Sequence, residues 1–245
     1  MNNLYKVAAG ALAIFQSGPQ DLPQKKDGVF RVIAVGDSIT EGDHSSDPKK
    51  FSWPVQLQNM VDTDTIEIVN LGVSGRTMMK NGDYPYWNEP QYQQALKSKP
   101  DAVVLMLGTN DAKTYQWDLE EYTKDFKEMA NIFLGMDSNP DLHIMVPPPL
   151  YQNGLWSMNQ TIINDILPDL IPKIAKELGQ EDNVISIFEA MGGKDLDAWQ
   201  YLCNGQSCDG CHPNDAGYSQ LASIVYRHLF LKPLPAQKED IIDMV

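Results

Sequence analysis

The stretch that decides the fold covers residues 32–40 and reads Val32-Ile33-Ala34-Val35-Gly36-Asp37-Ser38-Ile39-Thr40. A short, continuous apolar run that a glycine closes predicts a buried β-strand. Ser38 would then lie just beyond the carboxyl end of that strand, where open α/β sheets bind their ligands. We therefore interpret Ser38 as a candidate nucleophile, although Asp-Ser after glycine is also ordinary turn and N-cap chemistry.

The same pattern returns four more times along the chain. Apolar segments at 66–70, 102–107, 142–146 and 184–188 predict strands, and helical patterns at 53–60, 91–97, 119–134, 161–178 and 214–231 follow the five strands in turn. Prolines 168 and 172 are expected to kink or split the fourth helix. This alternation predicts one α/β domain, in which helices cover both faces of a parallel sheet.

Composition and charge describe an ordinary globular protein with an acidic surface. The 245 residues are 42% hydrophobic, and 19 basic against 33 acidic side chains give a net charge of −14. Such a surface repels nucleic acid and anionic membranes, and it suits a neutral or cationic small molecule. We expect no cofactor and no metal, and the composition is compatible with a monomer.

The two ends of the chain lie outside the predicted domain, which spans 29–232. Residues 1–28 begin with a short lysine-bearing start and an apolar run at 7–15, which resembles a signal peptide and is too short to span a bilayer. Its cleavage site is poor, so an arm that packs on the domain is the alternative. We predict a secreted or extracytoplasmic protein, with the cytoplasm as the alternative, and an acidic tail at 233–245.

Three cysteines, Cys203, Cys208 and Cys211, fall within nine positions near the carboxyl end, and there are no others. One bridge and one free thiol is the simplest arrangement. We expect the bridge to join Cys203 to Cys208 or Cys211. Zinc is disfavoured because a fourth ligand is missing unless His212 serves.

Further polar residues sit where the predicted strands end. Ser74-Gly75 follows the second strand and Asn110 the third, so that both share an edge of the sheet with Ser38. Asp209 precedes His212 by three residues, and in a turn this carboxylate would face the imidazole and fix its tautomer. Each of these residues also has a purely structural interpretation as a turn or cap. His44, in the polar loop after Ser38, is expected to be exposed to solvent, with a substrate contact as the less favoured alternative.

Four blocks of sequence together resemble the SGNH (GDSL) hydrolase superfamily. They read Gly-Asp-Ser-Ile-Thr at 36–40, Asn-Leu-Gly-Val-Ser-Gly at 70–75, Gly-Thr-Asn-Asp at 108–111 and Asp-Gly-Cys-His-Pro-Asn at 209–214. All four occur in order over roughly residues 30–232. The resemblance implies a flavodoxin-like, three-layer α/β/α fold whose five parallel strands are ordered 2-1-3-4-5.

The resemblance also implies a role for each matching residue. Ser38 would be the nucleophile, His212 the general base and later the general acid, and Asp209 the residue that orients His212. The oxyanion hole would consist of the backbone N–H groups of Ser38 and Gly75 and the side-chain amide of Asn110. Gly72 is the alternative to Gly75 for the second donor.

Two aromatic loops would overhang this edge, because they follow the second and fourth strands. Their candidate substrate contacts are Tyr84, Tyr86, Trp87, Tyr151 and Trp156, although rings in such loops can equally pack the loop onto the domain. The first loop resembles carbohydrate acetylesterases more than lipases. We therefore expect a serine esterase that removes acetyl groups from a saccharide or similar polar ester. The alternatives are a lipid or thioester acylhydrolase and a catalytically silent saccharide-binding module.

Overall fold

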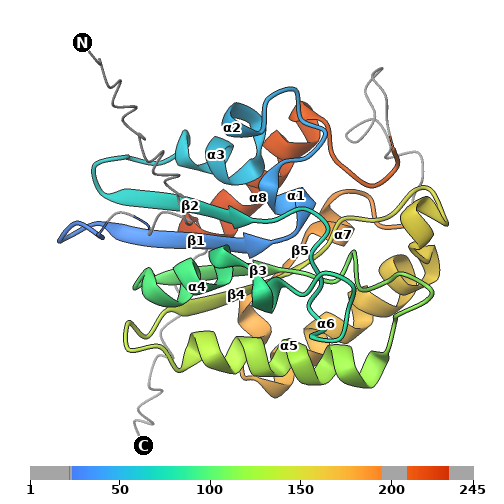
Figure 1. The fold of residues 1–245 in the computed structure, drawn as a ribbon. Helices are drawn as coiled ribbons and strands as arrows, with labels where there is room; N and C mark the ends of the chain where they lie inside the picture. The colour runs from blue at the N-terminus through green and yellow to red at the C-terminus, as the bar shows by residue number, and fades with distance from the viewer. Residues whose placement is uncertain (1–21, 23, 195–208, 232–245) are drawn as a thin grey trace, which may run out of the picture.

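A computed structural model of the protein describes residues 22, 24–194 and 209–231 and contains one β-sheet. Its five parallel strands are β1 (Phe30–Gly36), β2 (Ile66–Gly72), β3 (Ala102–Met106), β4 (Asp141–Val146) and β5 (Val184–Ser186). They are ordered β2-β1-β3-β4-β5 (Figure 1). The predicted α/β class and strand order are confirmed. All carboxyl ends meet at one edge, as in other parallel sheets.

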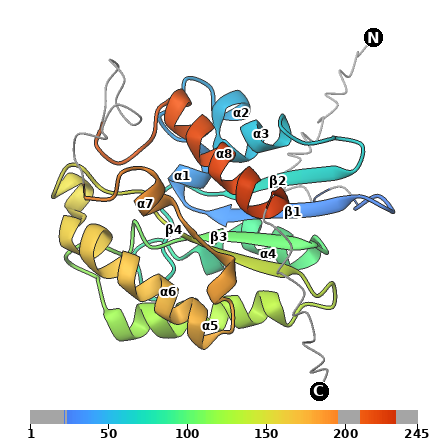
Figure 2. The same ribbon diagram turned by 180° about the vertical axis from the view of Figure 1, so that it is seen from behind.

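Helices cover both faces of the sheet, as Figures 1 and 2 show from opposite sides. On one face lie α2 (Pro48–Phe51), α3 (Trp53–Gln58) and α8 (Asp215–Phe230), and on the other lie α4 (Pro90–Lys97), α5 (Leu119–Leu134) and α6 (Leu167–Glu177). The two shortest, α1 (Ser38–Glu41) and α7 (Ile187–Ala190), directly follow β1 and β5. No helix in the described ranges is long and apolar enough to cross a membrane.

Strand β1 is apolar from Val32 to Val35 because both of its faces are covered there. Ile33 and Val35 pack in the cluster that contains Phe126 of α5, whereas Val32 and Ala34 pack on the opposite side, with α3 and α8. Successive side chains of a strand point to opposite faces, so a strand buried on both sides reads as a continuous apolar run.

One sequence-based boundary was wrong, and one helix is divided, as its prolines led us to expect. The fifth strand stops at Ser186, and the apolar residues Ile187 and Phe188 begin α7, where the Ser186 hydroxyl accepts a hydrogen bond from the Glu189 N–H at 3.3 Å. The predicted helix over 161–178 divides into a π-helical turn, Ile162–Ile166, and α6. The division comes before Pro168, which lacks the N–H that would continue a regular helix.

The turn from β1 into α1 is closely packed. Asp37 caps α1 by accepting a hydrogen bond from the Ile39 N–H at 3.0 Å. A Cβ on Gly36 would lie 2.2 Å from Thr40 Oγ1, and one on Gly72 would lie 2.2 Å from the backbone nitrogen of Glu41. The ends of β1 and β2 therefore press directly against α1, and they fix where Ser38 stands.

A second constraint holds the loop that follows β2. Asp111, buried beyond the end of β3, accepts hydrogen bonds from the Met79 N–H at 2.7 Å and the Met78 N–H at 2.9 Å. Burial raises the pKa of Asp111 from its ordinary value of 3.8 to about 7, although the two N–H groups oppose that rise. Burial likewise raises the pKa of Asp37 to about 6.

Replacing Gly72 by alanine is expected to destabilise the fold. The new Cβ would meet backbone atoms of α1, which cannot move aside as a flexible side chain does, and such overpacking costs about 1–3 kcal/mol. The free energy of unfolding in urea measures the loss. Gly135→Ala is the matched control, because its Cβ would meet nothing closer than 3.2 Å at a φ of −87°. Equal urea midpoints for the two variants would contradict this account of the packing.

Asp111→Asn should destabilise the protein in a pH-dependent way. An amide cannot accept from both Met78 and Met79, and one unpaired buried N–H costs about 1–3 kcal/mol. Folding raises the pKa of Asp111, so the folded state holds this proton more tightly, and wild-type stability falls as the pH rises from about 4 to about 7. The variant lacks that titration. Its deficit in unfolding free energy should therefore be larger at pH 5 than at pH 8, and a deficit that grows with pH would refute the assignment.

Candidate active site

Three side chains from opposite ends of the chain form one line of hydrogen bonds at the carboxyl edge of the sheet. His212 Nε2 lies 2.8 Å from Ser38 Oγ, and His212 Nδ1 lies 2.5 Å from Asp209 Oδ2. Ser38 and His212, 174 positions apart, are both buried. The structure thus brings together Ser38, Asp209 and His212, as the sequence blocks predicted.

The turn that carries His212 is held by the same carboxylate. Asp209 Oδ1 accepts the backbone N–H groups of Cys211 and His212, each at 2.8 Å. Burial alone would raise the pKa of Asp209, but the hydrogen bonds from the ring and backbone of His212 outweigh it and lower this pKa to about 2. An ionised Asp209 assigns the ring proton of His212 to Nδ1, so that the Nε2 lone pair faces the Ser38 hydroxyl.

Two further residues of the predicted site line the same cavity. Gly75 and Asn110 stand beside Ser38 in its wall. Gly75 has a φ of +80°, and nothing lies within 4 Å of where its Cβ would be. Asn110 Nδ2 donates to the carbonyl of Arg76 at 3.2 Å, which ties the loop after β3 to the loop after β2. Gly72 is not in the wall, and its N–H donates to Asn70 Oδ1 at 2.9 Å, so the structure favours Gly75 over Gly72.

The cavity has a volume of about 430 Å³, and exposed aromatic rings stand around it. Tyr84 and Trp156, both predicted substrate contacts, line it with exposures of 58% and 53%. The Trp156 ring meets that of His212 at a centroid distance of 5.4 Å and an angle of 61°. The backbone turns sharply there, because Trp156 has a φ of +46° and Ser157 one of +67°.

The other three aromatic candidates are not in the cavity wall, which corrects the sequence-based prediction. Tyr86 is fully buried, and its hydroxyl donates to the Leu71 carbonyl at 2.6 Å. Trp87 donates Nε1–H to the Met78 carbonyl at 2.7 Å. Tyr151 is buried against the α8 side of the sheet. These rings pack their own loops onto the domain, which was the alternative interpretation.

Tyr151 nevertheless supports the site through its backbone. Its N–H donates to the Gly210 carbonyl at 2.8 Å, and this bond anchors the turn between Asp209 and His212. The side chain of Asn214 caps α8 directly after that turn by accepting the Gly217 N–H at 2.9 Å. The loop after β4 and the start of α8 therefore both fix the imidazole.

Sequence reasoning missed two cavity residues, Lys113 and Tyr115. Both contact Asp83: Lys113 Nζ lies 2.6 Å from its Oδ2, and the Tyr115 hydroxyl donates to the same oxygen at 2.8 Å. Lys113 also stands 5.8 Å from the centre of the Tyr84 ring. Both follow Asn110 in the loop after β3. Their position just beyond a strand end could have identified them as residues of the site.

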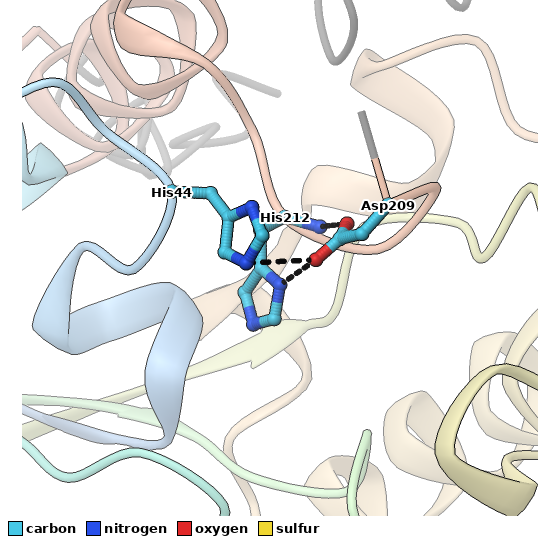
Figure 3. Close-up of side chains that lie close together, drawn as sticks. All are labelled: His44, Asp209 and His212. Atoms are coloured by element: carbon cyan, nitrogen blue, oxygen red, sulfur yellow. Dashed lines mark hydrogen bonds and ion pairs between the residues drawn. The ribbon is translucent and has the colours of Figure 1, made fainter. Parts of the chain in front are cut away.

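Sequence reasoning also missed the contacts of His44, whose ring lies next to the hydrogen bonds that join Ser38, His212 and Asp209. Its ring stacks on that of His212, with centroids 4.8 Å apart and planes 6° apart (Figure 3). Its Nε2 is 3.2 Å from Asp209 Oδ2. The ring is exposed to solvent, as expected, with a side-chain exposure of 41%, but it also contacts Asp209 and His212. Among the described residues, His44, Asp209 and His212 offer ligand atoms within 4.8 Å of one another, and the hydrogen bonds account for this closeness.

Only one of the three cysteines lies in the described part of the chain. Cys211 carries a free, buried thiol whose pKa burial raises well above its usual value. A bridge from Cys203 to Cys211 is therefore not present in the structure. Cys203 and Cys208 lie outside the described residues, and a bridge between them stays a prediction.

Comparisons with known proteins find relatives of this chain both by sequence and by structure. A curated acetylxylan esterase from Xylanibacter ruminicola is 30% identical over 227 residues, which cover 84% of this chain and 44% of that protein. This chain thus spans less than half the length of that relative.

Solved structures share the fold. A carbohydrate acetylesterase family member from Sinorhizobium meliloti superposes with a TM-score of 0.61 at 20% identity, over 82% of this chain and 99% of its own. A lipase/acylhydrolase from Enterococcus faecalis gives a TM-score of 0.64 at 20% identity, over 85% and 100%. The model of the GDSL-like lipase/acylhydrolase family matches residues 34–220, a span that holds Ser38, Asn110 and His212. The chain belongs to this family.

Proposed function

We propose that this protein is a serine esterase that removes acetyl groups from a saccharide or similar polar ester. The observation that carries the proposal is the line of hydrogen bonds from Ser38 through His212 to Asp209, which opens on a cavity of about 430 Å³. In the mechanism, Ser38 Oγ attacks the carbonyl carbon of the ester while His212 Nε2 takes its proton.

The charges that develop in this step have partners in the site. Asp209, whose pKa is lowered to about 2, stays ionised at neutral pH and stabilises the imidazolium of His212. The oxyanion would accept from Asn110 Nδ2 and from the N–H groups of Gly75 and Ser38. The N–H of Ser38 lies in the first turn of α1, where helical N–H groups have no partner within the helix.

The remaining steps reuse the same groups. His212 returns its proton to the oxygen of the leaving alcohol, and the acyl group stays on Ser38 as an ester. His212 then takes a proton from water, whose oxygen attacks the acyl carbon, and Ser38 leaves with that proton as the acid is released.

The residues that line the cavity support the proposal that the substrate is a sugar that carries a small acyl ester. The exposed rings of Tyr84, Tyr115 and Trp156 offer flat apolar faces of the kind that pack on sugar rings. The net charge of −14 disfavours anionic lipid. The acetylxylan esterase relative supports the same substrate class.

A panel of esters tests this proposal. We expect wild-type protein to hydrolyse p-nitrophenyl acetate faster than the octanoate and to release acetate from acetylated xylan or acetylated sialic acid. Ser38→Ala should lower kcat/KM by about 10⁴-fold or more, because it removes the nucleophile. A strong rise in rate with acyl length would support a lipid or thioester acylhydrolase instead. Binding of saccharide with equal, background hydrolysis by both proteins would indicate a silent binding module.

Asn110→Ala tests the proposed oxyanion hole. Loss of one donor should lower kcat by about 10²–10³-fold and leave KM nearly unchanged, because the donor acts on the transition state. Asn88→Ala, the same substitution at an exposed position, is the control and should keep wild-type kcat. Thermal melts of both variants check the fold, since Asn110 also bonds to Arg76. A loss confined to KM would contradict this role.

A further inference from the structure

We propose that His44 is a positioning residue of this site, which holds Asp209 from the side of the fold that carries Ser38 and covers the Asp209–His212 pair. The inference rests on the proposed function and adds a residue that neither the sequence blocks nor the comparisons assign.

Four nitrogen atoms contact the Asp209 carboxylate, and three of them donate hydrogen bonds from its own turn. Oδ1 takes the N–H groups of Cys211 and His212, and Oδ2 takes His212 Nδ1–H. Among the described residues, the fourth contact, from His44 Nε2 at 3.2 Å to Oδ2, comes from another part of the chain. Figure 3 shows both imidazoles directed at the same oxygen. His44 therefore links Asp209 to the segment that follows α1.

The loop that carries His44 is fixed on both sides of it. The carbonyl of Asp43 accepts the Tyr218 hydroxyl of α8 at 2.6 Å. Ser46 donates its N–H and its hydroxyl to the carboxylate of Asp215, at 2.8 and 2.6 Å. His44 itself has a φ of +62°, a left-handed conformation that non-glycine residues rarely adopt. Such a conformation persists only where its surroundings impose it, and it often marks a functional position.

The stacked ring suits the charge that the reaction creates. When His212 receives the proton of Ser38, a cation forms 4.8 Å below the face of the His44 ring. In the proposed role, the His44 ring donates the proton on its Nε2 to Asp209 Oδ2 and exchanges no proton with substrate. The charged group in contact with His44 is Asp209, and two more carboxylates lie on or against its loop: its neighbour Asp43, and Asp215, which binds Ser46. The ring also separates the hydrogen bond between Asp209 and His212 from solvent, where it would be weaker.

Three substitutions of His44 distinguish an effect of its contact with Asp209 from an effect of its left-handed backbone conformation. Glutamine places its amide nitrogen where Nε2 stands, asparagine places it nearer Nδ1, and phenylalanine keeps a ring without a donor. We expect His44→Asn and His44→Phe to lower kcat about tenfold, the effect of one lost hydrogen bond of ordinary strength, with KM within about twofold of wild type. His44→Gln should keep kcat within about threefold.

A purely structural role gives the opposite order. Asparagine tolerates a left-handed backbone better than glutamine does, so relief of strain would make His44→Asn the better variant. A kcat for His44→Asn equal to or above that of His44→Gln would overturn the proposal. So would wild-type kcat in all three variants.

A measurement on the ligand-free protein keeps this test independent of turnover. The His212 Nδ1–H proton should give a downfield proton NMR signal that is unchanged in His44→Gln and displaced in His44→Asn and His44→Phe. His212→Ala identifies the signal by removing it. If hydrolysis does not depend on Ser38 while this signal behaves as described, the proposed function fails and the positioning role stands. A signal that is the same in all three His44 variants overturns the positioning role.

Discussion

Everything at the carboxyl edge of the sheet depends on how closely the ends of β1 and β2 approach α1. Gly36 and Gly72 leave no room for a Cβ, because each such atom would lie 2.2 Å from an atom of the short helix. This contact fixes the first turn of α1, and with it both the hydroxyl and the N–H of Ser38. The cavity, the two loops beside it and the turn of His212 are arranged around that fixed point.

Burial acts on three carboxyl groups near the site with two different outcomes. Asp37 and Asp111 are buried without a cationic partner in contact, so desolvation raises the pKa of each, to about 6 and about 7. Asp209 is only partly buried and receives the ring and backbone N–H groups of His212, so its pKa falls to about 2. The same residue type is thus a structural acceptor at two positions and a permanent anion at the third. The different pKa values come from the depth of burial and from the hydrogen bond of the His212 ring, not from the sequence next to each aspartate.

Sequence patterns predicted the sheet, and the short sequence blocks named residues that the structure brings together at one edge, because both are local signals. Each of Ser38, Asn110 and His212 belongs to a short block at a strand end or helix start, and parallel strands bring such ends together. The aromatic loops had no such periodicity. Tyr84 and Tyr86 are two residues apart, yet one is exposed in the cavity and the other is fully buried. Only the tertiary packing of the loop separates them. The contact between His44 and Asp209 was missed for the same reason, since the two residues lie 165 positions apart in the sequence (209 − 44).

The distance along the chain between Ser38 and His212 has a consequence for synthesis. The two residues are 174 positions apart, so at about 5–20 residues per second a ribosome needs roughly 10–35 s to make the second after the first. During that interval the nascent chain carries the serine without its base. The His212 imidazole reaches its place only when α8 docks beside α3. Among the elements that the structure describes, α8 is the last to be made. In the proposed mechanism, reactivity toward esters therefore arises only at the end of folding, and a chain interrupted before residue 212 has the serine and the cavity loops but lacks the proposed base.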